Sequence, residues 1–152
     1  MKFHELLQHY RSDILDIATE RLMDANLPHY KSLGEEQRRA YLAHLLETTR
    51  QSAETHNLML LNQYVEEISE NRFYTGYPLY EVQHAIEDLE TAVWVVLRAQ
   101  LNSEDFNKIA GQIGMYFGAG KNLLAEAYVI RATQRKKPTI NLQALFTGTD
   151  GV

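Results

Sequence analysis

Apolar side chains recur at steps of three and four along nearly the whole chain, which is the spacing of one buried helix face. Before Pro28, this series consists of Phe3, Leu6, Leu7, Tyr10, Ile14, Ile17 and Leu22. We expect Asn26-Leu27-Pro28 to end this first helix, because a proline ring cannot continue a preceding helix. The positions between the apolar steps are mostly charged, so the helix is predicted to lie with one face on a core.

A second helix is expected after Ser32-Leu33-Gly34-Glu35, which has the form of a capping box. In that motif the Ser32 hydroxyl accepts a hydrogen bond from the Glu35 amide. The buried stripe of this helix is predicted to hold Leu42, Leu45, Leu46, Thr49 and Ala53. A short third helix is predicted from Leu58, Leu61, Val65 and Ile68. It should stop near Gly76, because glycine readily takes the left-handed conformation that follows a helix.

Two further helices complete the pattern. Pro78 suits the first position of the fourth helix, where its missing N–H is not needed. The apolar positions of this helix are Leu79, Val82, Ile86, Leu89, Val93 and Val96. Asn102 or Ser103 is expected to cap a fifth helix. The buried face of that helix is predicted to hold Phe106, Ile109, Ile113, Phe117, Leu124 and Ala127.

The sequence therefore predicts an all-α protein, a single bundle of about five helices with short connections. No segment alternates between apolar and polar residues with the period of two that a half-buried strand shows. Residues 1–137 are expected to form one helical domain, and residues 138–152 a short flexible C-terminal tail. A length of 152 residues fits one domain.

Composition and charge exclude several classes of protein. The chain has no cysteine, which excludes disulfides, thiolate metal sites and a cysteine nucleophile. A net charge of −5 disfavours nucleic-acid binding, which needs a basic field. The longest strongly apolar run is 92–97, far below the ~20 residues that span a bilayer, and the N-terminus carries no signal-peptide-like run. We therefore expect a cytoplasmic protein that binds neither nucleic acid nor membrane.

No catalytic or cofactor-binding constellation is found in the sequence. Glu81 and His84 have the Glu-x-x-His spacing of di-metal helical bundles, but a second copy of that motif is missing. The glycine-rich stretch from Gly114 to Asn122 resembles a phosphate loop only faintly, since it lacks the final Ser or Thr. The prediction is a protein that is not an enzyme, with no metal and no cofactor.

The stretch from 73 to 97 carries four acidic residues and neither lysine nor arginine: Glu81, Glu87, Asp88 and Glu90. A run of like charge is usually a solvated face, and this is what we expect here, with a partner-docking surface as the alternative. The Glu81–His84 pair is correspondingly predicted to be solvated or to serve the helix start.

Three features mark candidate surfaces for a partner or a dimer. Tyr74, Tyr77 and Tyr80 cluster at one turn, where they could pack in the core or form a contact surface. Trp94 lies off the main stripe of its helix and faces either a second helix layer or a dimer partner. Gly114 and Gly118 interrupt the fifth helix, together with Gly111 and Gly120. They indicate either close approach of a crossing helix or a hinge.

The stretch from Glu70 to Val82 also resembles a known family. The residues that carry the resemblance are Arg72, Gly76, Pro78, Leu79, Glu81 and Val82, followed by a long apolar helix through Trp94. This pattern is similar to the RsbRD-type N-terminal domain, and the order of predicted helices agrees over residues 1–135. The resemblance implies a helical, globin-related sensor domain, dimeric and without haem, that precedes a STAS output domain or a histidine kinase in bacterial stress response.

The function implied is a non-catalytic regulatory domain in signal transduction. Its partners would be a second copy, as a homodimer, and a protein of the kinase, STAS or anti-sigma type. The length leaves no room for an output domain, so we expect it to signal through such a partner. The alternative is a small-molecule or haem-binding bundle, for which His44 and His84 are the mid-helix candidates.

Overall fold

The computed structural model describes residues 1–136, which form seven helices and no strand. The helices are α1 (Phe3–His9), α2 (Arg11–Asp24), α3 (Pro28–Ser32), α4 (Glu35–Thr55), α5 (Met59–Tyr74), α6 (Leu79–Gln100) and α7 (Ser103–Lys136). The predicted all-α bundle is thus confirmed for this part of the chain. The predicted C-terminal tail over 138–152 lies outside the described residues.

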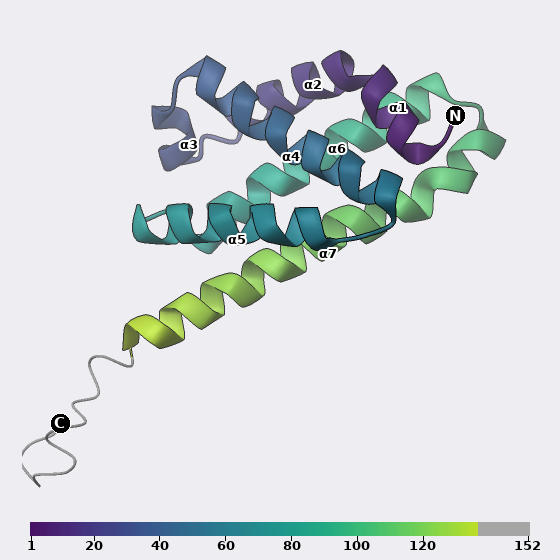
Figure 1. The fold of residues 1–152 in the computed structure, drawn as a ribbon. Helices are drawn as coiled ribbons and strands as arrows, with labels where there is room; N and C mark the ends of the chain where they lie inside the picture. Colours follow the sequence, from purple (N-terminus) through teal and green to yellow (C-terminus); the bar gives the residue numbers. More distant parts are fainter. Residues whose placement is uncertain (137–152) are drawn as a thin grey trace, which may run out of the picture.

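The sixth helix, α6, lies at the centre of the bundle. Its most extensive contacts are with α2 and α7, while α4 lies over α1, α2 and α5 (Figure 1). The α6 side chains with no exposed surface are Glu81, Val82, Ala85, Leu89, Ala92, Val93 and Leu97. The last turns of α7 extend past the other helices (Figure 1). The core is therefore built around α6, as expected for the helix with the strongest apolar pattern.

The structure has more helices than the sequence predicted, for two local reasons. The first segment bends at Tyr10, whose backbone angles are φ −100° and ψ 18°. Backbone hydrogen bonds still bridge the bend, from Tyr10 to Leu6 and from Ile14 to Tyr10. No proline or glycine stands there, so the periodicity could not reveal it. Pro28, in turn, starts the short helix α3 besides ending the segment before it.

The helix starts agree with the sequence in part. The capping box predicted at Ser32 and Glu35 is wrong, because the Ser32 hydroxyl donates to the His29 carbonyl oxygen at 2.7 Å and Gly34 is the N-cap of α4. Pro78 is the N-cap of α6, one residue before its expected place. The predicted cap of the last helix is confirmed, since the Asp105 N–H donates to Asn102 Oδ1 at 2.8 Å.

The turn after α5 has the geometry predicted from Gly76. Gly76 has a φ of +90°, and its N–H donates to the Phe73 carbonyl oxygen at 3.2 Å. The next N–H, of Tyr77, donates to the Arg72 carbonyl oxygen at 2.8 Å. These two hydrogen bonds satisfy the last carbonyls of α5 in a Schellman motif. The turn therefore fixes the direction in which α6 leaves.

Replacing Gly76 with alanine is expected to lower the free energy of unfolding by about 1–2 kcal/mol, because a Cβ is strained at positive φ. A Cβ would meet no atom within 4 Å at Gly76 or at Gly114, so both sites have room for a methyl group. Gly114 lies inside α7, where alanine is about 1 kcal/mol more favourable than glycine, so Gly114→Ala is the control and should raise the free energy of unfolding. Urea unfolding measures both variants; a gain in stability for Gly76→Ala as well would contradict the assignment of strain to Gly76.

Candidate functional site

The residues of the family-like motif gather at one end of the bundle, around the turn between α5 and α6. The Arg72 guanidinium lies 5.5 Å from the ring centroid of Tyr30, 5.1 Å from that of Tyr41 and 4.8 Å from that of Tyr77. Its Nε also donates to the Tyr30 hydroxyl at 3.4 Å. These four residues, here called the Arg72 cluster, join α3, α4, the end of α5 and the turn.

The rings of the Arg72 cluster form a packed unit. The Tyr30 ring lies 5.6 Å from that of Tyr41 and 5.1 Å from that of Tyr77, and all three tyrosines are buried. Burial raises the pKa of Tyr30 and raises that of Tyr41 well above its ordinary value. The Tyr30 and Tyr41 phenols therefore stay neutral at physiological pH. Ring faces, rather than phenolates, stabilise the Arg72 charge.

The helix α7 is connected to the same turn through Tyr128. The Tyr128 hydroxyl donates to the backbone carbonyl oxygen of Tyr77 at 2.9 Å, and burial raises the pKa of Tyr128. The Phe73 ring meets the Tyr128 ring at 5.5 Å between centroids. A change at the turn would therefore reach α7 through direct contacts.

Glu81 lies beside the Arg72 cluster with no exposed surface. One carboxylate oxygen accepts from the His29 backbone N–H at 3.0 Å, and the other pairs with His29 Nδ1. Glu81 thus binds the start of α3 from the first turn of α6. The solvated alternative for the Glu81–His84 pair is wrong for Glu81, which is buried, whereas the position of Glu81 in the first turn of α6 agrees with the alternative that it serves the helix start.

Asp88, two turns further along α6, is a second buried carboxylate. His84 Nδ1 lies 3.0 Å from one of its oxygens and Arg21 Nε lies 3.6 Å from the other. Burial raises the pKa of Asp88, whereas the two partners act in the opposite direction. Glu90 pairs with Lys121 at 2.9 Å, and Glu87 alone of the four acids is exposed. The predicted solvated acidic face is therefore wrong for most of its members.

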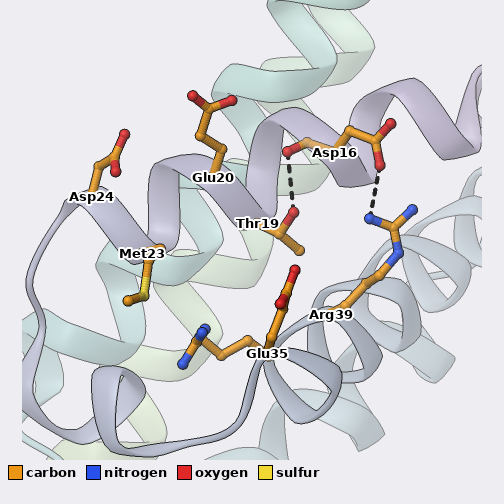
Figure 2. Close-up of a pocket in the computed structure, with 8 residues that line it drawn as sticks. Asp16, Thr19, Glu20, Met23, Asp24, Glu35 and Arg39 are labelled. Carbon is orange, nitrogen blue, oxygen red and sulfur yellow. Dashed lines mark hydrogen bonds and ion pairs between the residues drawn. The ribbon is translucent and has the colours of Figure 1, made fainter.

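An open groove of about 480 Å³ lies between α2 and the start of α4 (Figure 2). Its lining residues are Asp16, Thr19, Glu20, Met23, Asp24, Glu35, Arg38 and Arg39. Arg39 is paired with Asp16 at 2.8 Å, as Figure 2 shows. The Arg38 guanidinium donates to backbone carbonyl oxygens, including that of Tyr30 at 3.2 Å. Protein oxygens thus already engage both arginines that line the groove.

A second groove, of about 370 Å³, is mainly apolar and lies between the start of α5 and the middle of α7. Its lining residues are Leu58, Met59, Asn62, Ala119, Asn122, Leu123 and Glu126. Exposed apolar side chains continue on both helices around it. The large exposed ones on its side of the two helices are Leu58, Met59, Met115, Val129 and Ile130, here called the α5–α7 surface. Apolar side chains gathered in this way mark a contact surface more often than apolar side chains scattered singly.

The three tyrosines predicted to form a contact surface have different environments in the structure. Tyr74 and Tyr80 are both 61% exposed, whereas Tyr77 is in the core and is not available to a partner. Trp94 is partly buried, and its ring lies 5.3 Å from that of Phe106 in α7. The intramolecular interpretation of Trp94 is therefore the supported one.

Within the described residues, Gly111, Gly114 and Gly118 do not mark a helix crossing, whereas a Cβ at Gly120 would lie 4.0 Å from the Leu61 side chain of α5. A Cβ added at Gly114 or Gly118 would meet no atom within 4 Å, so the intramolecular crossing expected there is wrong. A glycine inside a helix is about 1 kcal/mol less favourable than alanine. The fold of the described residues does not offset this cost by close packing at Gly114 or Gly118. Their roles at a partner or hinge stay predictions.

The two histidines considered for haem have protein partners. The His44 ring stacks on Tyr64 with 4.2 Å between ring centroids, and His84 is bound to Asp88. The hollow that Tyr64 shares with Ile86 and Leu124 leaves no room for a water molecule. Within residues 1–136, no three His, Asp or Glu side chains gather as a metal site would need. Over the same residues, no helix has the length and apolar character to cross a bilayer.

The sequence did not predict the partners of the motif residues. His29, Tyr30 and Tyr41 lie far from Arg72 and Glu81 along the chain and have no motif of their own. Pro28 was the available signal in the sequence, because proline is common at the first position of a helix. It could have indicated a short helix whose buried side chains contact the main bundle. Compared with protein-family models, curated proteins and solved structures, the chain has no significant match. The resemblance to the RsbRD-type domain therefore stays a prediction.

Proposed function

We propose that the chain is a non-catalytic cytoplasmic regulatory or sensor domain that acts in signal transduction through protein–protein contacts. The observation that supports this proposal is the α5–α7 surface. Five large apolar side chains are exposed there around an apolar groove, in a protein whose remaining apolar residues are largely buried. Exposed apolar area of this kind is stabilised when another protein covers it. The partner would be of the kinase, STAS or anti-sigma type.

The contacts of the turn suggest how a signal would reach this surface. The Arg72 cluster and Glu81 hold α3, α4 and α6 together at one end of the bundle. Tyr128 connects that end to α7, and the next residues, Val129 and Ile130, belong to the α5–α7 surface. A ligand or partner that displaces the turn would therefore shift Val129 and Ile130. A packed core transmits such a shift between alternative arrangements.

Photo-crosslinking in the producing cell tests the proposal. A photoreactive amino acid replaces Met59, which is 59% exposed and lines the apolar groove, or Val95, which is 47% exposed on α6. Because an interface contacts only one side of the protein, we expect discrete adducts from position 59, one of them with a regulatory protein, and none from position 95. Mass spectrometry identifies the adduct. The same adduct pattern from both positions would contradict the proposal.

A further inference from the structure

On the outward face of α7, a basic and an acidic side chain are placed so that two antiparallel copies of the helix would bring opposite charges together. Lys108 and Glu126 are eighteen residues apart, which is about five helical turns, so they lie on one line of the helix. Along the helix they are equally distant from Phe117, one on each side. Both are exposed, and between them this line carries uncharged residues: Gly111, Met115, Ala119 and Asn122. The line is about 27 Å long.

The apolar groove opens beside the second half of this line. Ala119, Asn122 and Glu126 belong to both the line and the groove, and Leu58 and Met59 form the opposite wall. Met115, one turn before the groove, is 54% exposed. The face thus has an apolar projection in its first half and an apolar hollow in its second half.

We propose that this face binds a second copy of the chain, with the two α7 helices antiparallel and the two-fold axis near Phe117. This inference rests on the protein-contact function proposed above and names one occupant of the α5–α7 surface. A two-fold contact requires that residue i meets j while j meets i. Reversal about Phe117 brings Lys108 opposite Glu126 of the second copy, and the same pair forms twice.

The apolar groups are complementary in the same register. Met115 lies opposite Ala119 of the second copy and enters its groove between α5 and α7. Gly111 lies opposite Leu123 of the second copy, so the large leucine side chain packs where glycine has no side chain. Since a Cβ at Gly111, Gly114 or Gly118 would meet no atom within 4 Å, the helix backbone is open to close approach. Lys108 now lies 3.7 Å from Glu104 of its own helix, a surface pair that can exchange partners.

Light scattering on the intact chain tests the dimer. We expect a dimer at about 100 µM that dissociates on dilution by mass action. Met115→Glu should weaken the dimer more than tenfold, because each of its two carboxylates would enter an apolar groove. Met23→Glu is the matched control, since Met23 is 41% exposed on α2, away from α7, and should leave the dimer unchanged. Circular dichroism checks that both variants stay folded.

Charge exchange tests the antiparallel register. Lys108→Glu and Glu126→Lys should each weaken the dimer several-fold, because each change places like charges together twice. The double variant should restore the wild-type dissociation constant. A strict monomer at about 100 µM, a dimer insensitive to Met115→Glu, or a double variant weaker than both single variants would each overturn this inference.

The outcomes also separate this inference from the proposed function. A monomer that still gives a specific partner adduct at position 59 would remove the dimer and keep the regulatory function. A dimer with the expected charge exchange, but without any adduct to a regulatory protein, would keep the dimer and remove the function.

Discussion

Replacing Glu81 with alanine is expected to lower the free energy of unfolding by about 2–4 kcal/mol. The carboxylate has no exposed surface and accepts from both the backbone N–H and the ring of His29. Its removal leaves the N–H at the start of α3 without this acceptor and opens space beside the Arg72 cluster. Urea unfolding followed by circular dichroism measures the loss.

Two further variants show which part of Glu81 matters. Glu81→Gln keeps an oxygen that can accept from the His29 N–H, so it should recover about half of the lost stability. Glu87→Ala is the matched control, because Glu87 is exposed on the same helix and should change stability by less than about 0.5 kcal/mol. If Glu81→Ala and Glu87→Ala were equally mild, the buried carboxylate would not hold α3 in place.

The apolar stripes of α4, α6 and α7 could be predicted because helix periodicity is a local property of the sequence. The stripe positions Leu42, Leu89 and Phe117, for example, are all buried. The turn between α5 and α6 could also be predicted from a local signal, because glycine is the residue type favoured at positive φ and Gly76 has a positive φ. What the pattern cannot show is which helices enclose a given face.

Burial of Glu81 and Asp88 could not be predicted for this reason. Both residues stand next to stripe positions, Val82 and Leu89, and on a helix with one covered face they would reach water. Here α2 and α7 both pack against α6, so the flanks of the stripe are covered as well. The partner of Glu81 is 52 residues away in the sequence, and a single sequence carries no signal for such a pairing.

Replacing Arg72 with alanine is the second change with a large expected effect, a loss of about 2–4 kcal/mol in the free energy of unfolding. The guanidinium lies over three buried tyrosine rings, and a cation at a desolvated ring face contributes up to about 2 kcal/mol. Truncation also leaves a cavity among rings that otherwise pack on the side chain. Thermal and urea unfolding measure the loss.

Arg72→Lys separates charge from shape. Lysine keeps the positive charge but lacks the planar group that stacks on several rings, so an intermediate loss is expected. Arg39→Ala is the control for removing an arginine from a surface pair, since the side chains of Arg39 and Asp16 are 40% and 64% exposed and the expected loss is below about 1 kcal/mol. An Arg72→Ala loss no larger than that of Arg39→Ala would mean that the ring contacts contribute little.

The location of the loss distinguishes a local latch from general weakening. If the Arg72 cluster holds α3, α4 and the α5–α6 turn together, Arg72→Ala should speed amide hydrogen exchange in α3 and around Gly76. Exchange in α1 should change least, because none of its residues belongs to the cluster and α1 lies at the opposite end of the bundle from α3 (Figure 1). Exchange that rises equally in all helices would argue against a local latch. A rise that extends through Tyr128 to Val129 and Ile130 is expected if the turn is coupled to the α5–α7 surface.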